Sequence, residues 1–327
     1  MSIISVSHLK KYYQVTQKEP GLSGSIKSLF NRKYRQVKAI DDIGFNIEEG
    51  ELVGFIGPNG AGKTTTLKVL SGLLYPNSGE ISVLGFTPFA RKNDFLKNIS
   101  LVMGQKNQLW WDLPPVDTFL LNKEIYEVSD SDYKTTLEEM TRILNIENIL
   151  ETPVRKLSLG QRMKCELVAS LIHRPKVLFL DEPTIGLDVV MQKTLRDFIK
   201  EYNRKYQATI LLTSHYMDDV KELCRRIIII DKGQIIYDGS LAKISQKFAT
   251  EKIITLILSE EVDLKTFAKY AEIKKVEFPK VILAVPRKSV SQVATKILQN
   301  YPIADLNIEE ESIEDIIRKI FSGKELG

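Results

Sequence analysis

The chain of 327 residues carries 46 basic and 42 acidic side chains, a formal net charge of +4, and 43% hydrophobic residues. These values are typical of a globular protein of about two domains, and they exclude a disordered chain, a collagen-like repeat and a strongly basic nucleic-acid binder. The chain has only two cysteines, which predicts a protein without disulfides in a reducing compartment. Residues 1–11 have no apolar leader, and no apolar run approaches the ~20 residues that cross a bilayer. We therefore expect a soluble, cytosolic protein.

Residues 1–240 alternate short β-branched runs with longer helical patterns, which predicts a mostly parallel sheet covered by helices. Four apolar runs are expected to be strands buried on both faces: 52–56, 177–180, 209–212 and 227–230. In such sheets ligands bind at the carboxyl ends of the strands, so we expect the chemistry there.

A basic stretch, residues 14–38, interrupts this first domain. Pro20-Gly21 and Gly24 break regular structure, whereas Ile26, Leu29 and Phe30 have helical spacing. We expect an inserted loop with one basic helical turn. It could contact lipid headgroups or a membrane protein, or it could be a solvated loop.

Residues 241–327 form a second pattern. The expected elements are a strand at 252–259, a helix at 264–271, a hairpin of 273–278 and 281–285, a helix near 290–298, a strand at 303–308 and a final helix at 313–321. This order predicts a small α+β accessory domain. Its role, in dimerisation or in regulation, is left open by the sequence.

Residues 57–64 satisfy the phosphate-loop pattern G-x-x-x-x-G-K-[ST] between an expected strand and an expected helix, which is the context the pattern requires. The predicted nucleotide-binding residues of the loop are Gly57, Pro58, Asn59, Gly60, Ala61, Gly62, Lys63, Thr64 and Thr65. Backbone N–H groups would surround the phosphates, Lys63 would reach the β- and γ-phosphates, and Thr64 would ligate Mg²⁺.

An acidic pair follows the expected strand 177–180. Asp181 is suited to hold the Mg²⁺ shell, and Glu182 is suited to polarise an attacking water. Such a pair is also common at a solvated helix start. The phosphate loop upstream favours the catalytic interpretation.

Further motifs follow in a fixed order: Gln105 after the apolar run 99–103, Leu157-Ser158-Leu159-Gly160-Gln161, Gly186-Leu187-Asp188, and His215 after Thr213-Ser214. With the phosphate loop and the acidic pair, this constellation resembles the ATP-binding cassette family, specifically the nucleotide-binding subunits of transporters. Tyr13, or Tyr12 in an alternative register, falls where the family places an aromatic ring on adenine.

The resemblance implies a phosphate-loop ATPase fold with an antiparallel edge subdomain and a helical subdomain at about 106–172. It implies ATP and Mg²⁺ as cofactors, Gln105 as a ligand of the metal, and His215 as a hydrogen-bond partner of the γ-phosphate. It also implies a head-to-tail homodimer in which Ser158, Gly160, Gln161 and Asp188 serve the nucleotide of the partner cassette.

Leu159 stands where the family signature more often has glycine. Because leucine does not adopt a positive φ cheaply, we expect an ordinary helix start at this point, with Ser158 as its N-cap.

The function implied by the resemblance is that of an ATPase that powers a membrane exporter through separate permease chains, at the cytoplasmic face of the membrane. The alternatives are a soluble cassette acting on ribosomes or nucleic acid, and a regulatory module that no longer hydrolyses ATP. Within the family, ribosome-acting members usually carry two cassettes and DNA-repair members a long coiled coil, whereas this chain has each motif once and no sustained heptads between Lys63 and Gly160. The regulatory module would need a broken catalytic residue, whereas Lys63, Asp181, Glu182 and His215 are all present.

The sequence around Gly186–Val190, the basic stretch and the appended C-terminal domain resemble the exporter group that pairs one cassette with separate permease chains, and this resemblance favours export over import. Trp110 and Trp111 precede Pro114-Pro115, where the family contacts its permease. These rings either anchor that interface or pack inside the helical subdomain.

Overall fold

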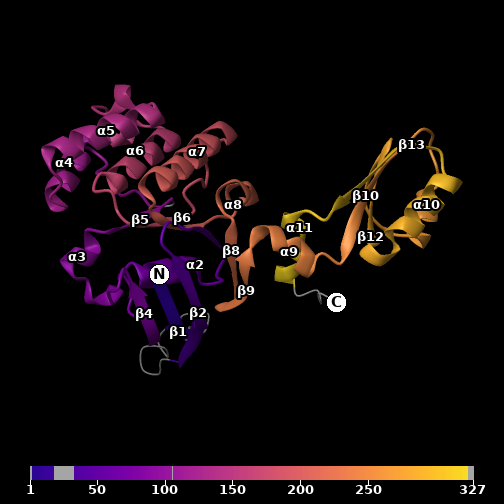
Figure 1. Cartoon of the computed structure of the whole chain (residues 1–327), viewed down its shortest axis with the longest axis horizontal. Coiled ribbons are helices and arrows are strands. Elements are labelled where there is room, and N and C mark those ends of the chain that lie inside the picture. The colour runs from indigo at the N-terminus through magenta and orange to yellow at the C-terminus, as the bar shows by residue number, and fades with distance from the viewer. Residues whose placement is uncertain (1, 18–32, 105, 323–327) are drawn as a thin grey trace, which may run out of the picture. The chain divides into compact units, whose positions relative to one another are not determined.

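A computed structural model describes residues 2–17, 33–104 and 106–322 of the chain, which falls into two units, residues 1–239 and 240–327 (Figure 1). Each unit has its own hydrophobic core. Within the described ranges, no helix has the length and apolar character needed to cross a membrane.

The central sheet of the first unit has six strands in the order β5-β6-β7-β3-β8-β9. They are β3 (Leu52–Ile56), β5 (Ile99–Met103), β6 (Val177–Asp181), β7 (Thr209–Thr213), β8 (Arg226–Asp231) and β9 (Gln234–Ser240). The neighbouring pairs β5–β6, β6–β7, β7–β3 and β3–β8 are parallel. Every residue of β6 and β7 is buried, which confirms the prediction of strands covered on both faces.

A second, antiparallel sheet of the first unit consists of β1 (Ser2–Gln17), β2 (Lys33–Glu48) and β4 (Ser78–Val83), in the order β2-β1-β4. Its apolar face shares one core with the central sheet and with helix α2 (Lys63–Leu70), including Ile43, Phe55 and Leu67. This core fixes the start of α2, and with it the phosphate loop, between the two sheets.

The prediction of an inserted loop at residues 14–38 is wrong at both ends of that range. Residues 14–17 belong to β1 and pair in register with residues 33–36 of β2, and the ladder continues through Lys38. The side chains described here, at 13–15 of β1 and 34–38 of β2, are exposed, so no buried face imposes an apolar alternation on the sequence. Residues 18–32, with the expected helical turn, lie outside the described residues.

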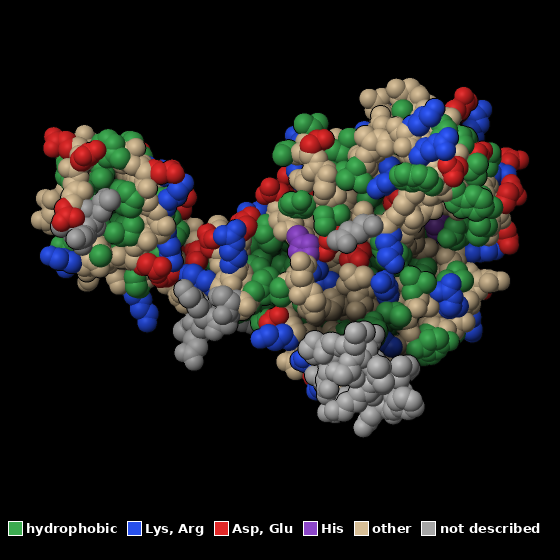
Figure 2. All heavy atoms as spheres, turned by 180° about the vertical axis from the view of Figure 1, so that it is seen from behind, with side chains coloured by type: hydrophobic (Ala, Val, Ile, Leu, Met, Phe, Trp, Pro, Cys, Tyr) green, Lys and Arg blue, Asp and Glu red, His purple; other side chains and the backbone are tan. Residues whose placement is uncertain are grey.

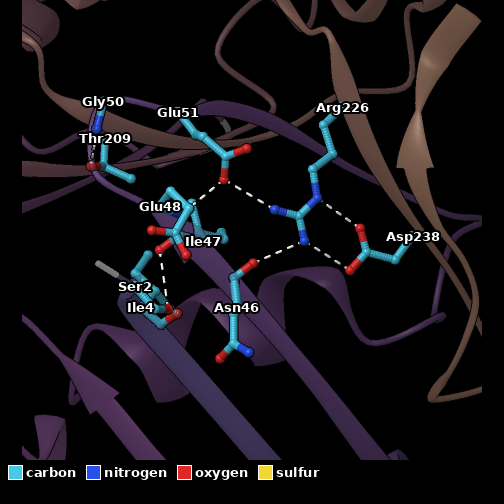
Figure 3. Close-up of polar contacts among 10 residues, drawn as sticks. All are labelled: Ser2, Ile4, Asn46, Ile47, Glu48, Gly50, Glu51, Thr209, Arg226 and Asp238. Atoms are coloured by element: carbon cyan, nitrogen blue, oxygen red, sulfur yellow. Dashed lines mark hydrogen bonds and ion pairs between the residues drawn. The ribbon is translucent and has the colours of Figure 1, made fainter.

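Arg226, at the start of β8, joins the two sheets at the amino ends of the central strands (Figure 3). Its guanidinium donates to both oxygens of Asp238 at 2.8 and 2.9 Å, to Glu51 at 3.0 Å and to the carbonyl of Asn46 at 2.9 Å. A bidentate pair of this kind is geometrically specific. The hydrogen bonds of Arg226 therefore join the two sheets at the amino ends of the central strands, whereas the phosphate loop follows the carboxyl end of β3.

Helices cover the central sheet and fill the segment between β5 and β6 (Figure 1). The α-helices are α3 (Asn93–Leu96), α4 (Pro115–Ile125), α5 (Asp130–Leu144), α6 (Leu159–Leu171), α7 (Val189–Tyr206) and α8 (Met217–Leu223), and the short 3₁₀ turns are η1 (Pro88–Ala90), η2 (Glu147–Ile149) and η3 (Val154–Lys156). Helices α4 and α5 both pack on α6. The parallel sheet, antiparallel sheet and helical subdomain confirm the fold class predicted from the sequence.

The second unit is built on an antiparallel sheet in the order β11-β12-β10-β13. Its elements are α9 (Leu241–Phe248), β10 (Glu251–Leu258), η4 (Leu264–Lys269), β11 (Glu272–Glu277), β12 (Lys280–Pro286), η5 (Arg287–Ser289), α10 (Val290–Asn300), β13 (Ile303–Glu310) and α11 (Ile313–Ser322). The predicted hairpin and the helix near 290–298 are confirmed.

The helix expected at 264–271 is a 3₁₀ turn instead of an α-helix. Phe267 is its fully buried anchor and packs into the core with Leu256 and Val293. The six-residue segment lies between β10 and β11, and 3₁₀ helices are frequent in such short connections.

Candidate functional site

The phosphate loop connects β3 to α2 and can only be built with glycine at two places. A Cβ on Gly57 would lie 2.2 Å from the carbonyl oxygen of Ile230, and one on Gly62, whose φ is +113°, would lie 2.4 Å from that of Ala39. Both values are shorter than any real contact of a Cβ. The loop is therefore held tightly against β2 and β8, with α2 beginning at Lys63.

The Lys63 side chain folds back over its own loop and is buried. Its ammonium donates to the carbonyl oxygens of Gly57 at 2.8 Å and Pro58 at 3.2 Å. Burial lowers the pKa of Lys63, and the nearby carboxylates of Glu182 and Asp181 oppose that shift. The ammonium is thus placed beside the backbone that would surround a phosphate group.

Asp181 ends β6 and accepts hydrogen bonds from hydroxyl groups on two sides. Thr64 Oγ1 donates to Oδ2 at 2.8 Å, and Thr213 Oγ1 donates to Oδ1 at 2.7 Å. A carboxylate and a hydroxyl are oxygen donors of the kind that Mg²⁺ prefers. The Thr64–Asp181 pair therefore fits the magnesium site expected from the sequence.

Glu182 and His215 contact each other across neighbouring strands. Oε1 of Glu182 lies 2.7 Å from Nε2 of His215. These residues follow the carboxyl ends of β6 and β7, which are paired in parallel, so the strand order brings two groups that are 33 positions apart in the sequence to one point. A carboxylate beside an imidazole can accept a proton from water and share it.

The backbone of Glu182 has a φ of +55°, which is uncommon for a residue other than glycine. Its N–H donates to the carbonyl oxygen of Thr213 at 3.1 Å. A Cβ on Gly104 would lie 2.1 Å from the carbonyl oxygen of Glu182. Sequence reasoning missed this contribution of Gly104. The neighbouring Gln105 lies outside the described residues.

The signature segment begins α6 with a capping box, as expected. Ser158 Oγ accepts from the backbone N–H of Gln161 at 3.2 Å, and the Gln161 side chain accepts from the N–H of Ser158 at 2.9 Å. Leu159 is the first helical residue. The first turn of α6 is therefore capped by these two hydrogen bonds, without a positive φ at Leu159.

Asp188 caps α7 in the same way, with Oδ1 accepting from the N–H of Met191 at 2.9 Å. The Met191 side chain packs against Gly160, and the Leu159 side chain packs against Gly186. The two segments are therefore in contact within one chain. Across the described part of the chain, no hydrogen bond or ion pair joins residues 158–161 or Asp188 to the phosphate loop.

The two candidates for the adenine-stacking ring have different surroundings. Tyr12 donates its hydroxyl to Asp41 at 2.5 Å, and Lys38 pairs with the same carboxylate at 3.0 Å. Tyr13 lies at the surface, with the Lys11 ammonium 5.4 Å from the centre of its ring. Tyr13 is therefore the more accessible of the two.

Trp110 and Trp111 are 58% and 51% exposed, so the alternative in which both pack inside the helical subdomain is wrong. Trp110 lines a groove of about 490 Å³ together with Leu121 and Ile125 of α4, which are also exposed. Arg162 of α6 lies 6.0 Å from the centre of the Trp111 ring. In Figure 2 exposed hydrophobic side chains alternate with charged ones over the larger unit.

Comparison with known proteins gives two family matches. The ABC transporter family matches residues 40–185, and the EvrA-like ABC transporter C-terminal domain matches residues 250–309. The ABC transporter ATP-binding protein NatA of Bacillus subtilis is 32% identical over 233 residues, 71% of this chain and 94% of that protein. The bacitracin transport ATP-binding protein BcrA of Bacillus licheniformis is 25% identical over 90% of this chain and 96% of its own length.

Solved structures share the fold. An ATP-binding subunit of an ABC transporter superposes with a TM-score of 0.63 and 24% identity, over 76% of this chain and 93% of that one. A dimeric ATP-binding cassette in a post-hydrolysis state, bound to ADP and Pi, gives a TM-score of 0.60 and 21% identity over 72% and 98% of the two chains.

Proposed function

This chain belongs to the ATP-binding cassette family as an ATPase subunit of a transporter, and from that premise we propose the roles of its residues, its partners and its direction of transport. Lys63 and the backbone of residues 57–65 bind the phosphates of ATP. Thr64 and Asp181 hold Mg²⁺, with Gln105 as a further ligand. When bound, the metal neutralises charge on the phosphate oxygens.

Glu182 is the residue that takes the proton of the attacking water, and His215 is its partner. The observation that carries this assignment is the 2.7 Å contact between the two side chains. The imidazole fixes the orientation of the carboxylate and stays within reach of the γ-phosphate side of the site. Tyr13 offers its accessible ring to adenine.

A second copy of the chain completes the site. The N-terminus of α6, a helix of 13 residues, is favourable for a phosphate group, and Ser158, Gly160 and Gln161 would present it to the nucleotide of the partner cassette. Beside Asp188, the adjacent Val189 and Val190 are 76% and 77% exposed. Such an exposed apolar pair next to the signature segment supports a dimer, and one of the similar cassettes was solved as a dimer.

The membrane partner is a separate permease, and it docks in the groove lined by Trp110, Leu121 and Ile125. The groove combines these apolar side chains with polar ones such as Gln108 and Asn122, and a groove of this kind is suited to receive an amphipathic helix. The chain would then work at the cytoplasmic face of the membrane. Among similar proteins are one of bacitracin transport and one of linearmycin resistance, and these support an exporter.

The test is to purify tagged chain from detergent-solubilised membranes of its own cells and to identify what co-purifies. We expect proteins with membrane-spanning helices, and Mg²⁺-dependent release of phosphate from ATP by the complex. Recovery of ribosomes or nucleic acid without any membrane protein would support the soluble alternative instead.

A further inference from the structure

A buried carboxylate outside the proposed site connects several segments around it. Asp219, on α8, is fully buried. Its Oδ2 accepts hydrogen bonds from Thr184 Oγ1 at 2.5 Å and from Ser214 Oγ at 2.6 Å, and its Oδ1 accepts from Arg196 Nη1 of α7 at 3.0 Å. One side chain therefore joins α7, α8 and the segments after β6 and β7.

The two hydroxyl donors belong to the segments that carry the proposed catalytic pair. Thr184 is two residues after Glu182, and Ser214 directly precedes His215. Ser214 Oγ also accepts from the backbone N–H of Tyr216 at 2.9 Å, which closes the turn around His215. Asp219 thus restrains both segments just outside the 2.7 Å contact between Glu182 and His215.

Such a restraint is needed because the backbone of Glu182 is strained. Its φ of +55° persists only where the surroundings fix it from several sides. Its N–H is held by Thr213 on one side. On the other side the chain is held two residues later, where Thr184 donates to Asp219.

Arg196 supplies the charge that makes an ionised Asp219 acceptable in the interior. It is 5% exposed and lies between Asp219 and Glu222, to which its Nε donates at 3.0 Å. A buried carboxylate that accepts three hydrogen bonds, one from a guanidinium, is strongly oriented. An asparagine here would lose the ion pair and one acceptor while keeping nearly the same shape.

We propose that Asp219 is a positioning residue for ATP hydrolysis: by holding Thr184 and Ser214, it keeps Glu182 and His215 in the arrangement that activates water. This proposal rests on the proposed role of Glu182. Asp219 contacts neither the phosphate loop nor Asp181 among the described residues, so it acts on turnover and leaves nucleotide affinity alone.

The test compares Asp219→Asn with Glu222→Gln in the purified chain. Glu222→Gln is the matched control, because it neutralises the other carboxylate that pairs with Arg196, on the same helix, without touching Thr184 or Ser214. We expect Asp219→Asn to lower kcat by at least ~10-fold while the Kd for ATP stays within about threefold, the pattern of an interaction needed only in the transition state. Glu222→Gln should retain the wild-type kcat.

A double variant separates positioning from a general structural effect. Because Asp219 acts through Glu182, Asp219→Asn should cost little more when Glu182 is already Gln. Equal losses of kcat in both backgrounds, or a loss of ATP affinity in parallel with kcat, would overturn the proposal. Should Asp219→Asn fold poorly, Thr184→Val and Ser214→Ala each remove one donor and leave the Arg196 pair intact. Both are expected to lower kcat, and wild-type kcat in both would also overturn it.

The same data keep this proposal distinct from the proposed function. Wild-type turnover by Glu182→Gln would remove the catalytic assignment itself. Impaired turnover by Glu182→Gln together with wild-type turnover by Asp219→Asn would remove only the role of Asp219.

Discussion

Asp181 accepts from Thr64 and from Thr213, two residues far from it in the sequence, whereas Ser158 and Asp188 each accept from a backbone N–H three residues further along their own helix. The phosphate-loop half of the site is therefore tied together by long-range hydrogen bonds in a buried environment. The signature half satisfies its polar groups locally and keeps apolar side chains such as Val189 and Val190 in solvent.

From this difference we infer that the two halves have different tasks, one in ATP hydrolysis and the other in contact with another molecule. A preorganised set of buried groups is suited to chemistry, because its geometry does not have to form during the reaction. A locally satisfied helix start with an exposed apolar border is suited to contact with another molecule. Variants of the catalytic pair in the first half should therefore lower turnover while ATP is still bound, and variants in the second half should act through assembly.

The largest effect is expected for Glu182→Gln. The amide cannot take a proton from water, so turnover should fall by ~10²–10⁴-fold. ATP binding should be retained, and the ATP-bound dimer should accumulate. Phosphate release measures the first effect, and size-exclusion chromatography with ATP measures the second. Turnover at the wild-type rate would show that another group activates the water.

Ser158→Arg tests the signature half. Its bulk and charge at the start of α6 should prevent the closed dimer, and turnover should fall on the order of 10²-fold, as when a donor is removed from a preorganised site. ATP binding by the monomer should survive, because among the described residues Ser158 has no hydrogen bond to the phosphate loop of its own chain. Equilibrium binding and turnover at increasing protein concentration provide the measurement.

Mixing Ser158→Arg with Lys63→Ala subunits provides the matching control. A mixed dimer contains one site in which both halves are intact, so it should recover at most half of the wild-type turnover. Activity that is independent of protein concentration would contradict a composite site.

The exposed tryptophans test the second half in the membrane complex. Trp110→Ala/Trp111→Ala should weaken permease binding by at least ~2 kcal/mol, about 30-fold in Kd, if these rings are central anchors. The melting temperature and ATP affinity should remain those of the wild type, because both rings are more than half exposed. Tyr34→Ala removes a similarly exposed ring from β2 and serves as the control. Unchanged co-purification of the permease would place the docking surface elsewhere.

The phosphate loop and the acidic pair could be recognised in the sequence because each is a local run of residue types at fixed spacing. Gly57 to Gly62 follow β3 and lead directly into α2, and Asp181 is the last residue of its own strand. The capping box at Ser158 is equally local, since it joins residues three apart. Spacing alone is sufficient in these cases.

What the sequence could not reveal depends on packing between distant segments. The Glu182–His215 contact requires β6 and β7 to be neighbours, and the role of Asp219 requires α7 and α8 to meet behind them. The need for glycine at position 104 arises from the approach of the Glu182 carbonyl. Strand pairing at 14–17 was also missed, because the side chains described in that ladder, at 13–15 and 34–38, are exposed and no buried face imposes an apolar pattern.

The smallest expected effect concerns Glu166, which is buried on α6 behind the signature segment. Burial raises its pKa from 4.5 to about 7, opposed by the N–H of Gln108 and by Arg162. The folded state therefore binds this proton more tightly than the unfolded state does, so its contribution to stability falls as the pH rises from 4.5 to about 7.

Glu166→Gln removes that titration while keeping the shape of the side chain. At pH 8 the variant should be more stable than the wild type by on the order of 1 kcal/mol, a rise of roughly 2–4 °C in Tm, and the difference should shrink as the pH falls to 4.5. Glu138→Gln, at an exposed position on α5, is the control for losing one negative charge. Melting curves from pH 4.5 to 8 decide the point. Parallel profiles for the wild type and Glu166→Gln would mean that the carboxylate is stabilised as an ion, with Arg162 as the nearest cation at 3.8 Å. The ionised Glu166 carboxylate would then accept the hydrogen bond from the backbone N–H of Gln108 at every pH in that range.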